Sequence, residues 1–225
     1  MYLLLVTIIP SLVILFFFMY SDRFREPRKS ILKVFIYGCL ICIPAFFVNT
    51  ILDSFWFYQT KVPIELIGSF LVPALVEEAL KFLVLFYVVY KMKDFNEPID
   101  GMVYGVTVSL GFATLENVYY VFFSGYQDPL AIAYLRAFSA IPGHALDGVF
   151  MGYFFMKYVY VQKRNNLMLT FLVPYFLHAY YNYFAVINYK VMYLELIVGW
   201  TVALILFKKL KSKQKEKRIE YEKKL

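Results

Sequence analysis

The chain alternates seven long apolar segments with short polar loops, and this alternation limits the possible fold more than any other feature. The segments cover about residues 2–20, 31–52, 64–90, 100–123, 137–158, 167–188 and 190–210. Roughly 20 apolar residues are enough for a helix to cross the hydrocarbon core of a bilayer. Backbone groups in lipid must find hydrogen-bond partners within the protein, and segments this long favour helices over barrel strands. The sequence therefore predicts an all-α, polytopic transmembrane bundle of about seven helices.

Composition and the placement of charge agree with that fold. Of 225 residues, 61% are hydrophobic and 17% are charged, and the mean hydropathy of +0.62 excludes a water-soluble globule. Of the 23 Lys and Arg residues, 19 lie in the loops around 21–33, 91–100 and 157–166 and in the tail from Lys208, against three in the opposite loops. Cytoplasmic loops carry an excess of basic residues. We therefore expect the N-terminus outside and the C-terminus in the cytoplasm.

The loops are short and the chain has no repeats or flexible linkers. Residues 1–210 are therefore expected to form one membrane domain, followed by a basic cytoplasmic tail over residues 211–225. The net charge of +7 is concentrated on one side of the membrane, which indicates contact with anionic lipid. We expect the lipid bilayer, and no nucleic acid, as the partner of this surface.

Polar and ionisable side chains lie inside four of the apolar segments. They are Glu77, Glu78 and Lys81 in the third segment, Glu116 in the fourth, His144 and Asp147 in the fifth, and His178 and Asn182 in the sixth. Ionisable groups cost free energy in hydrocarbon and usually mark a proton relay, an ion path or a catalytic site. Consecutive helices run in opposite directions, so the histidines and glutamates can share one layer from the mid-membrane to the outer leaflet. A shared layer predicts a single site.

Helical spacing predicts which of these side chains meet within one helix. Lys81 follows Glu78 by three residues and Glu77 by four, so it can neutralise one of the two carboxylates. By the same spacing, Asp147 can orient the ring of His144. His178 and Asn182, four residues apart, share one helix face.

Three prolines precede these polar residues by two to four positions: Pro73, Pro142 and Pro174. A proline inside a helix removes a hydrogen bond and bends the helix. We therefore expect kinks that open a cavity for water beside the polar layer. Ser139–Pro142 also has the pattern of a helix start, which predicts a separate surface helix over 129–138.

Four sequence motifs resemble the PrsW family of bacterial intramembrane proteases. In chain order they are LVEEALKF, DGMVYGVTVSLGFATLEN, IPGHALDGVFMG and VPYFLHAYYNYF. That family is distantly similar to the CaaX-prenyl endopeptidases. The resemblance covers most of the chain and implies a multi-pass protein of the bacterial inner membrane that cleaves a membrane-anchored protein.

The resemblance also implies roles for the residues. In the wider group, the first glutamate of an EExxxR motif and a histidine on another helix activate water, and a later HxxxN stabilises the oxyanion. Carried over, Glu77 and His144 would prepare the water, while His178 and Asn182 would bind the oxyanion. Amide hydrolysis needs an activated water, a proton for the leaving nitrogen and donors for the oxyanion, and these residue types supply them.

The remaining residues depart from the CaaX pattern. Glu78 and Lys81 would support the site, Glu116 would be a further site residue, and EExxK replaces EExxxR. A prenylated C-terminus is therefore not expected as the substrate. The PrsW resemblance implies a single-pass substrate such as an anti-sigma factor, whose cleavage would start a stress response.

Other readings of the polar residues stay open. His144, His178 and Glu77 are also sufficient ligands for a catalytic zinc, although the HExxH helix that usually presents such ligands is absent. No GxSxG motif offers a serine nucleophile. Metal-free catalysis without a cofactor is therefore preferred over zinc. A proton-coupled transporter also needs buried Glu, His and Lys, but inverted repeats are not visible. A non-catalytic membrane scaffold is the last alternative.

Overall fold

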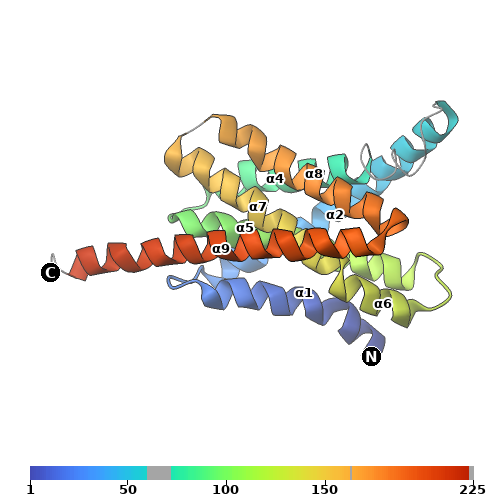
Figure 1. Ribbon diagram of the computed structural model, residues 1–225, viewed down its shortest axis with the longest axis horizontal. Coiled ribbons are helices and arrows are strands. Elements are labelled where there is room, and N and C mark those ends of the chain that lie inside the picture. Colours follow the sequence, from blue (N-terminus) through green and yellow to red (C-terminus); the bar gives the residue numbers. More distant parts are fainter. Residues whose placement is uncertain (60–71, 163, 223–225) are drawn as a thin grey trace.

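The computed structural model describes residues 1–59, 72–162 and 164–222, and all regular structure within these ranges is helical. The elements are α1 (Tyr2–Ser21), α2 (Arg28–Gln59), α4 (Pro73–Tyr87), a 3₁₀ turn (Val89–Lys91), α5 (Pro98–Phe122), α6 (Pro129–Phe138), α7 (Ala140–Val161), α8 (Asn165–Ile187) and α9 (Tyr189–Glu222). The longer helices lie side by side in a bundle (Figure 1). The predicted all-α class is confirmed.

Within the described residues, three helices are long and apolar enough to cross a membrane by length and composition. They contain the stretches Tyr2–Ser21, Arg28–Leu52 and Tyr189–Gln214, in α1, α2 and α9. The number of spans and the orientation of the termini remain predictions. Helix α9 continues through Leu210 into the basic tail, so the predicted boundary between domain and tail falls inside a helix.

The structure corrects one expectation about the prolines. Pro73 is the first residue of α4, where a proline is readily accommodated, so the predicted kink at this position is wrong. The part of the third apolar segment over residues 64–71 lies outside the described residues. Pro174 lies inside α8 as expected. The separate helix predicted over 129–138 is confirmed as α6 (Pro129–Phe138).

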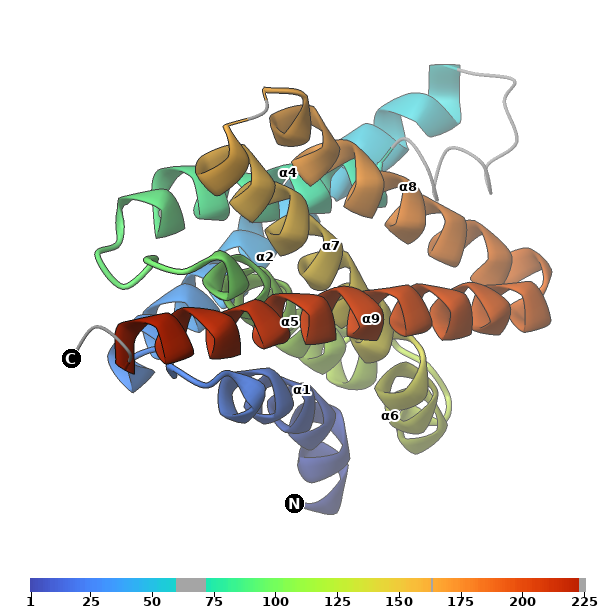
Figure 2. The ribbon, with the colours of Figure 1, turned by 60° about the vertical axis from the view of Figure 1, so that its left-hand side comes forward.

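Helix α5 is the centre of the bundle. It packs against α7, α2 and α1, and nearly all of its residues from Ile99 to Thr114 are buried. Figure 2 shows it enclosed by these helices and by α9. Because α5 has neighbours on all sides, its apolar residues are spread around the helix and do not form a stripe on one face.

Glycines allow α5 and α7 to approach closely. Gly101 and Gly105 on α5 face Gly148 and Gly152 on α7, and a Cβ added at Gly105 or Gly152 would collide with the carbonyl oxygen of the opposite glycine. Small residues four apart are the usual means of close helix packing in membranes. His144 lies one turn before Gly148, so this contact holds its ring at a defined place beside α5.

Candidate active site

Helix α4 presents two glutamates and a lysine to the centre of the bundle. Glu77, Glu78 and Lys81 are all buried. The ammonium Nζ of Lys81 lies 2.6 Å from Oε1 of Glu78, so the lysine pairs with the second glutamate. It also lies 3.1 Å from Nδ1 of His144 and 4.6 Å from the ring centre of Phe112. The lysine is thus held by contacts with α5 and α7 as well as by its own helix.

Helix α8 brings His178 against both glutamates. Its Nδ1 lies 2.8 Å from Oε1 of Glu78, and its Nε2 lies 3.9 Å from Oε2 of Glu77. Oδ2 of Asp147 lies 3.9 Å from Nδ1, which places this predicted partner of His144 beside His178. The two imidazole rings meet edge to face, with centroids 5.0 Å apart. Both histidines therefore belong to one cluster with the glutamates of α4.

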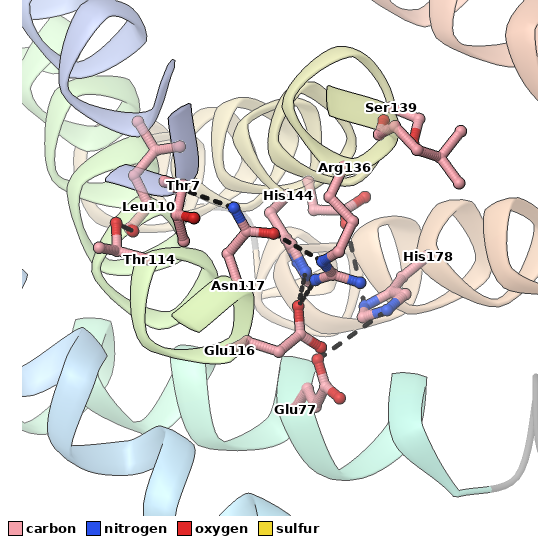
Figure 3. A network of polar contacts seen from close by, with 12 residues as sticks. Thr7, Glu77, Leu110, Thr114, Glu116, Asn117, Arg136, Ser139, His144 and His178 are labelled. Atoms are coloured by element: carbon pink, nitrogen blue, oxygen red, sulfur yellow. Dashed lines mark hydrogen bonds and ion pairs between the residues drawn. The ribbon is translucent and has the colours of Figure 1, made fainter. Parts of the chain in front are cut away.

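A second carboxylate group forms around Glu116 of α5. Its Oε2 accepts from Nη2 of Arg136 at 2.5 Å and lies 2.9 Å from Nε2 of His144. Nε of Arg136 donates to Oδ1 of Asn117 at 2.7 Å, and Nδ2 of Asn117 donates to the carbonyl oxygen of Thr7 at 2.8 Å. Figure 3 shows this network running from α1 through α5 and α6 to the histidines.

Sequence reasoning did not single out Arg136 and Asn117 as site residues. One feature of the sequence could have predicted such a partner. Glu116 is an acid inside an apolar segment, and no Lys or Arg lies one helical turn away from it. A buried carboxylate without a local cation needs one from another element. Arg136, on the short helix α6, supplies it.

The polar contacts form one continuous chain across the bundle. It runs through Thr7, Asn117, Arg136, Glu116, His144, Lys81, Glu78 and His178. Both carboxylates in this chain of contacts pair with a cation, Glu78 with Lys81 and Glu116 with Arg136. Glu77 lies outside this chain: Oε1 accepts from Asn49 at 3.4 Å, and Oε2 is buried with no hydrogen-bond partner among the described residues. Counting only described residues, Glu77 is the one site glutamate without a hydrogen-bonded cation.

The contacts also assign the proton positions on His144. Lys81 can only donate, so Nδ1 of His144 accepts, and Nε2 carries the proton that it donates to Glu116. Both ring nitrogens of His144 therefore already form hydrogen bonds. The resemblance pairs His144 with Glu77, whereas the ion-pair contact of Glu77 is with His178.

Two cavities meet at the site glutamates. One, of about 620 Å³, is lined by polar site residues, which include Arg136, Ser139, His144, His178 and Asn182. The other, of about 590 Å³, lies between α2 and α5 and is lined mainly by apolar side chains such as Ile43, Phe46, Phe112 and Leu115. Glu77 and Glu116 line both cavities. Asn182 thus shares a cavity with His178 and Glu77, as its predicted role requires.

Among the described residues of this site, two groups of donor atoms come close enough to be considered for a metal ion. The first holds Glu78, His144, Asp147 and His178, and the second holds Glu77, Glu116 and His144. The ligand types suit zinc. In the first group, however, the ammonium of Lys81 contacts Glu78 and His144 at 2.6 Å and 3.1 Å, where a metal would bind.

In the second group, Glu116 is already bonded to the proton of His144 and to Arg136. Zinc binding through Nε2 of His144 would require breaking its hydrogen bond to Glu116, because a histidine ligand must offer a free lone pair. The trio predicted as alternative zinc ligands, His144, His178 and Glu77, does not occur together in either group. The arrangement of donors therefore does not fit a divalent ion without displacing Lys81 in the first group or breaking the His144–Glu116 hydrogen bond in the second.

Buried carboxylates and histidines around a cavity form a candidate acid–base site in a helical protein whose apolar helices suit a membrane. Residues 26–208 match the family described as PrsW family intramembrane metalloprotease. The chain is 36% identical to Protease PrsW of Geobacillus kaustophilus over 77% of its own length and 75% of that protein. It is 33% identical to Protease PrsW of Clostridioides difficile over 87% and 84%, and to that of Bacillus subtilis over 78% and 79%.

The chain belongs to the PrsW family of intramembrane proteases. The resemblance drawn from the four motifs is thereby confirmed. Because the chain belongs to a protease family, the alternative of a proton-coupled transporter is not favoured. No solved structure matches the chain.

Proposed function

We propose that this protein is an intramembrane endopeptidase in which Glu77 activates the water that attacks a peptide bond. The main support is the environment of Glu77. Its Oε2 is buried without a hydrogen-bond partner among the described residues, 3.9 Å from Nε2 of His178, and Glu77 lines both cavities. Glu78 and Glu116 are bonded to Lys81 and Arg136 and are less available as bases. A carboxylate with a free oxygen can hold a water and take its proton.

His178 and Asn182 are proposed to stabilise the oxyanion that forms when the water adds to the peptide carbonyl. Glu78 holds Nδ1 of His178, which leaves Nε2 on the side of Glu77. Asn182 follows one turn later on α8 and lines the same cavity. Donors aimed at a developing oxyanion stabilise the transition state strongly. Glu77 then delivers the proton to the leaving nitrogen. His144 positions Lys81 and Glu116 through its two nitrogens.

The proposed substrate is a single-pass membrane protein such as an anti-sigma factor. The apolar cavity between α2 and α5 suits a hydrophobic segment, and Glu77 lies where this cavity meets the polar one. A helix hides its own amides by hydrogen bonding, so the substrate must unwind locally before water can attack. With the N-terminus outside, as the distribution of basic residues indicates, the cut falls in the outer half of the substrate helix or just beyond it.

Quantitative terminal proteomics of membranes tests this function without a preselected substrate. Cells that express the wild-type chain are compared with cells that express Glu77→Gln at the same level. New termini near the outer end of single-pass helices are expected only with the wild type, because glutamine cannot accept the proton from water. Identical sets of termini would reject the protease proposal. Cuts on the cytoplasmic side would reject the orientation.

Treatment with phenanthroline tests the metal-free mechanism. This chelator removes zinc and leaves Mg²⁺ and Ca²⁺ in place. Purified enzyme is expected to keep its cleavage rate after prolonged exposure and to hold no stoichiometric zinc by elemental analysis, because Lys81 and Arg136 already neutralise the carboxylates. Inactivation that added zinc reverses would instead support metal catalysis, as the family description states.

A further inference from the structure

A second group of buried carboxylates lies apart from the protease site, where the α1–α2 loop meets α5 and α9. Asp22 and Glu26 come from the loop, and Asp100 comes from the first turn of α5. Their exposed fractions are 3%, 8% and 1%, and one oxygen from each lies within 4.8 Å of the others. Three acids in so small a buried space repel one another when ionised.

The hydrogen-bond donors to this group are neutral. The hydroxyl of Tyr104 donates to Glu26, and the backbone amides of Asn96 and Glu97 donate to Oδ2 of Asp100 at 2.9 Å and 2.6 Å. Among the side chains that the structure describes, no Lys or Arg forms an ion pair with these acids. When these acids are ionised, the group has no cation to neutralise it among the described side chains.

Two buried oxygen atoms, one in the group and one on its neighbour Gln214, have no donor among the described residues. Gln214 of α9 donates through Nε2 to Oδ1 of Asp22 at 3.0 Å and to Oε2 of Glu97 at 2.6 Å. These two acceptors determine how the amide is oriented. Oε1 of Gln214 and Oδ2 of Asp22 are then left buried without a partner among the described residues. Each such acceptor costs stability unless something positive reaches it.

We propose that Asp22, Glu26 and Asp100 form a binding site for a hard divalent cation, Mg²⁺ or Ca²⁺, with Gln214 of α9 holding Asp22 from the side. The available ligands are all oxygen atoms, which these ions prefer. One cation would offset the repulsion among the acids and satisfy the unpaired Oδ2 of Asp22. Since the ligands come from the α1–α2 loop and the first turn of α5, the cation would fasten this loop to the start of the central helix, next to Gln214 of α9 (Figure 1).

A bound proton is the competing way to relieve the same repulsion. Burial raises the pKa of Glu26 to about 7, with Asp22 and Asp94 adding to the effect, so this carboxyl can hold a proton near neutral pH. The proton explanation predicts that stability depends on pH alone. The cation explanation predicts a dependence on Mg²⁺ or Ca²⁺ at constant pH.

Thermal unfolding of the purified full-length chain in detergent distinguishes these explanations. The protein is first freed of divalent ions with EDTA and then melted with excess MgCl₂ or CaCl₂, or with NaCl at equal ionic strength. A ligand at about a hundred times its Kd is expected to raise the Tm by about 5 to 10 °C. The readout does not involve proteolysis, so it is independent of the proposed enzyme activity.

Two matched variants locate the effect. Asp22→Asn removes one charge at nearly constant shape, and it is expected to abolish the shift while melting no lower than the wild type in EDTA. Asp128→Asn is the control, because Asp128 caps α6 outside the group and asparagine caps equally well. If Asp22→Asn folds poorly, Glu26→Gln serves the same purpose. No shift in the wild type, or an equal shift in the group variants, would overturn the proposal.

Discussion

Substitution of His178 by alanine is expected to lower the cleavage rate by about 10²- to 10⁴-fold. His178 is the histidine in contact with Glu77, and Glu78 fixes its ring. Asn182→Ala is expected to cost roughly 10²-fold if its amide is the second oxyanion donor. Initial rates of the purified variants on a substrate found by terminal proteomics provide the measurement. Asn188→Ala, at the exposed end of α8, is the control and should cleave like the wild type.

His144 is expected to matter for a different reason, and the matched variants separate the two roles. His144→Ala releases both Lys81 and Glu116, so a loss of similar size follows. His144→Gln should recover part of the rate, because its amide can accept from Lys81 and donate to Glu116. His178→Gln should not recover activity. Wild-type rates in both alanine variants would show that the catalytic assignment is wrong.

The Lys81→Met variant is expected to lose about 3–5 kcal/mol of stability, the usual cost of removing one partner of a buried ion pair. Methionine fills much of the same volume but leaves the fully buried carboxylate of Glu78 without its cation. For a chain of this size, the corresponding fall in Tm is about 6 to 20 °C. Thermal unfolding in detergent measures it, with Lys190→Met, at an exposed lysine, as the control.

A second substitution tests the cause of that loss. Lys81→Met combined with Glu78→Gln removes both charges, and most of the lost stability is expected to return. If Lys81→Met alone melts like the wild type, the pairing with Glu78 does not stabilise the fold. If the double variant is as unstable as the single one, lost packing against Phe112, and not the stranded charge, is the cause.

Local features of the site could be predicted because helical geometry repeats at short range. The spacing of Glu78 and Lys81 places them one turn apart in any α-helix, and the structure forms this pair. The same spacing also allowed Lys81 to pair with Glu77, and only contacts from other helices distinguish the two glutamates. His178 of α8 meets Glu78, while Asn49 of α2 reaches Glu77.

Contacts between distant segments could not be predicted in this way. Arg136 and Glu116 are 20 residues apart, and Gln214 and Asp22 are 192 apart. Such pairs depend on the rotation and depth of each helix against its neighbours. In this bundle the close glycine contact between α5 and α7 helps to set them.

By itself, the amino-acid sequence determined the helical class, the family and the set of polar residues buried among apolar ones. These properties follow from composition, period and motif order, which are local along the chain. The tertiary structure alone decided that His144 joins Lys81 to Glu116, that His178 faces Glu77, and that Arg136 completes the site. The physical reason is that a buried charge is stabilised by whichever partner the packing brings within hydrogen-bond distance, and helix packing is a property of the whole bundle.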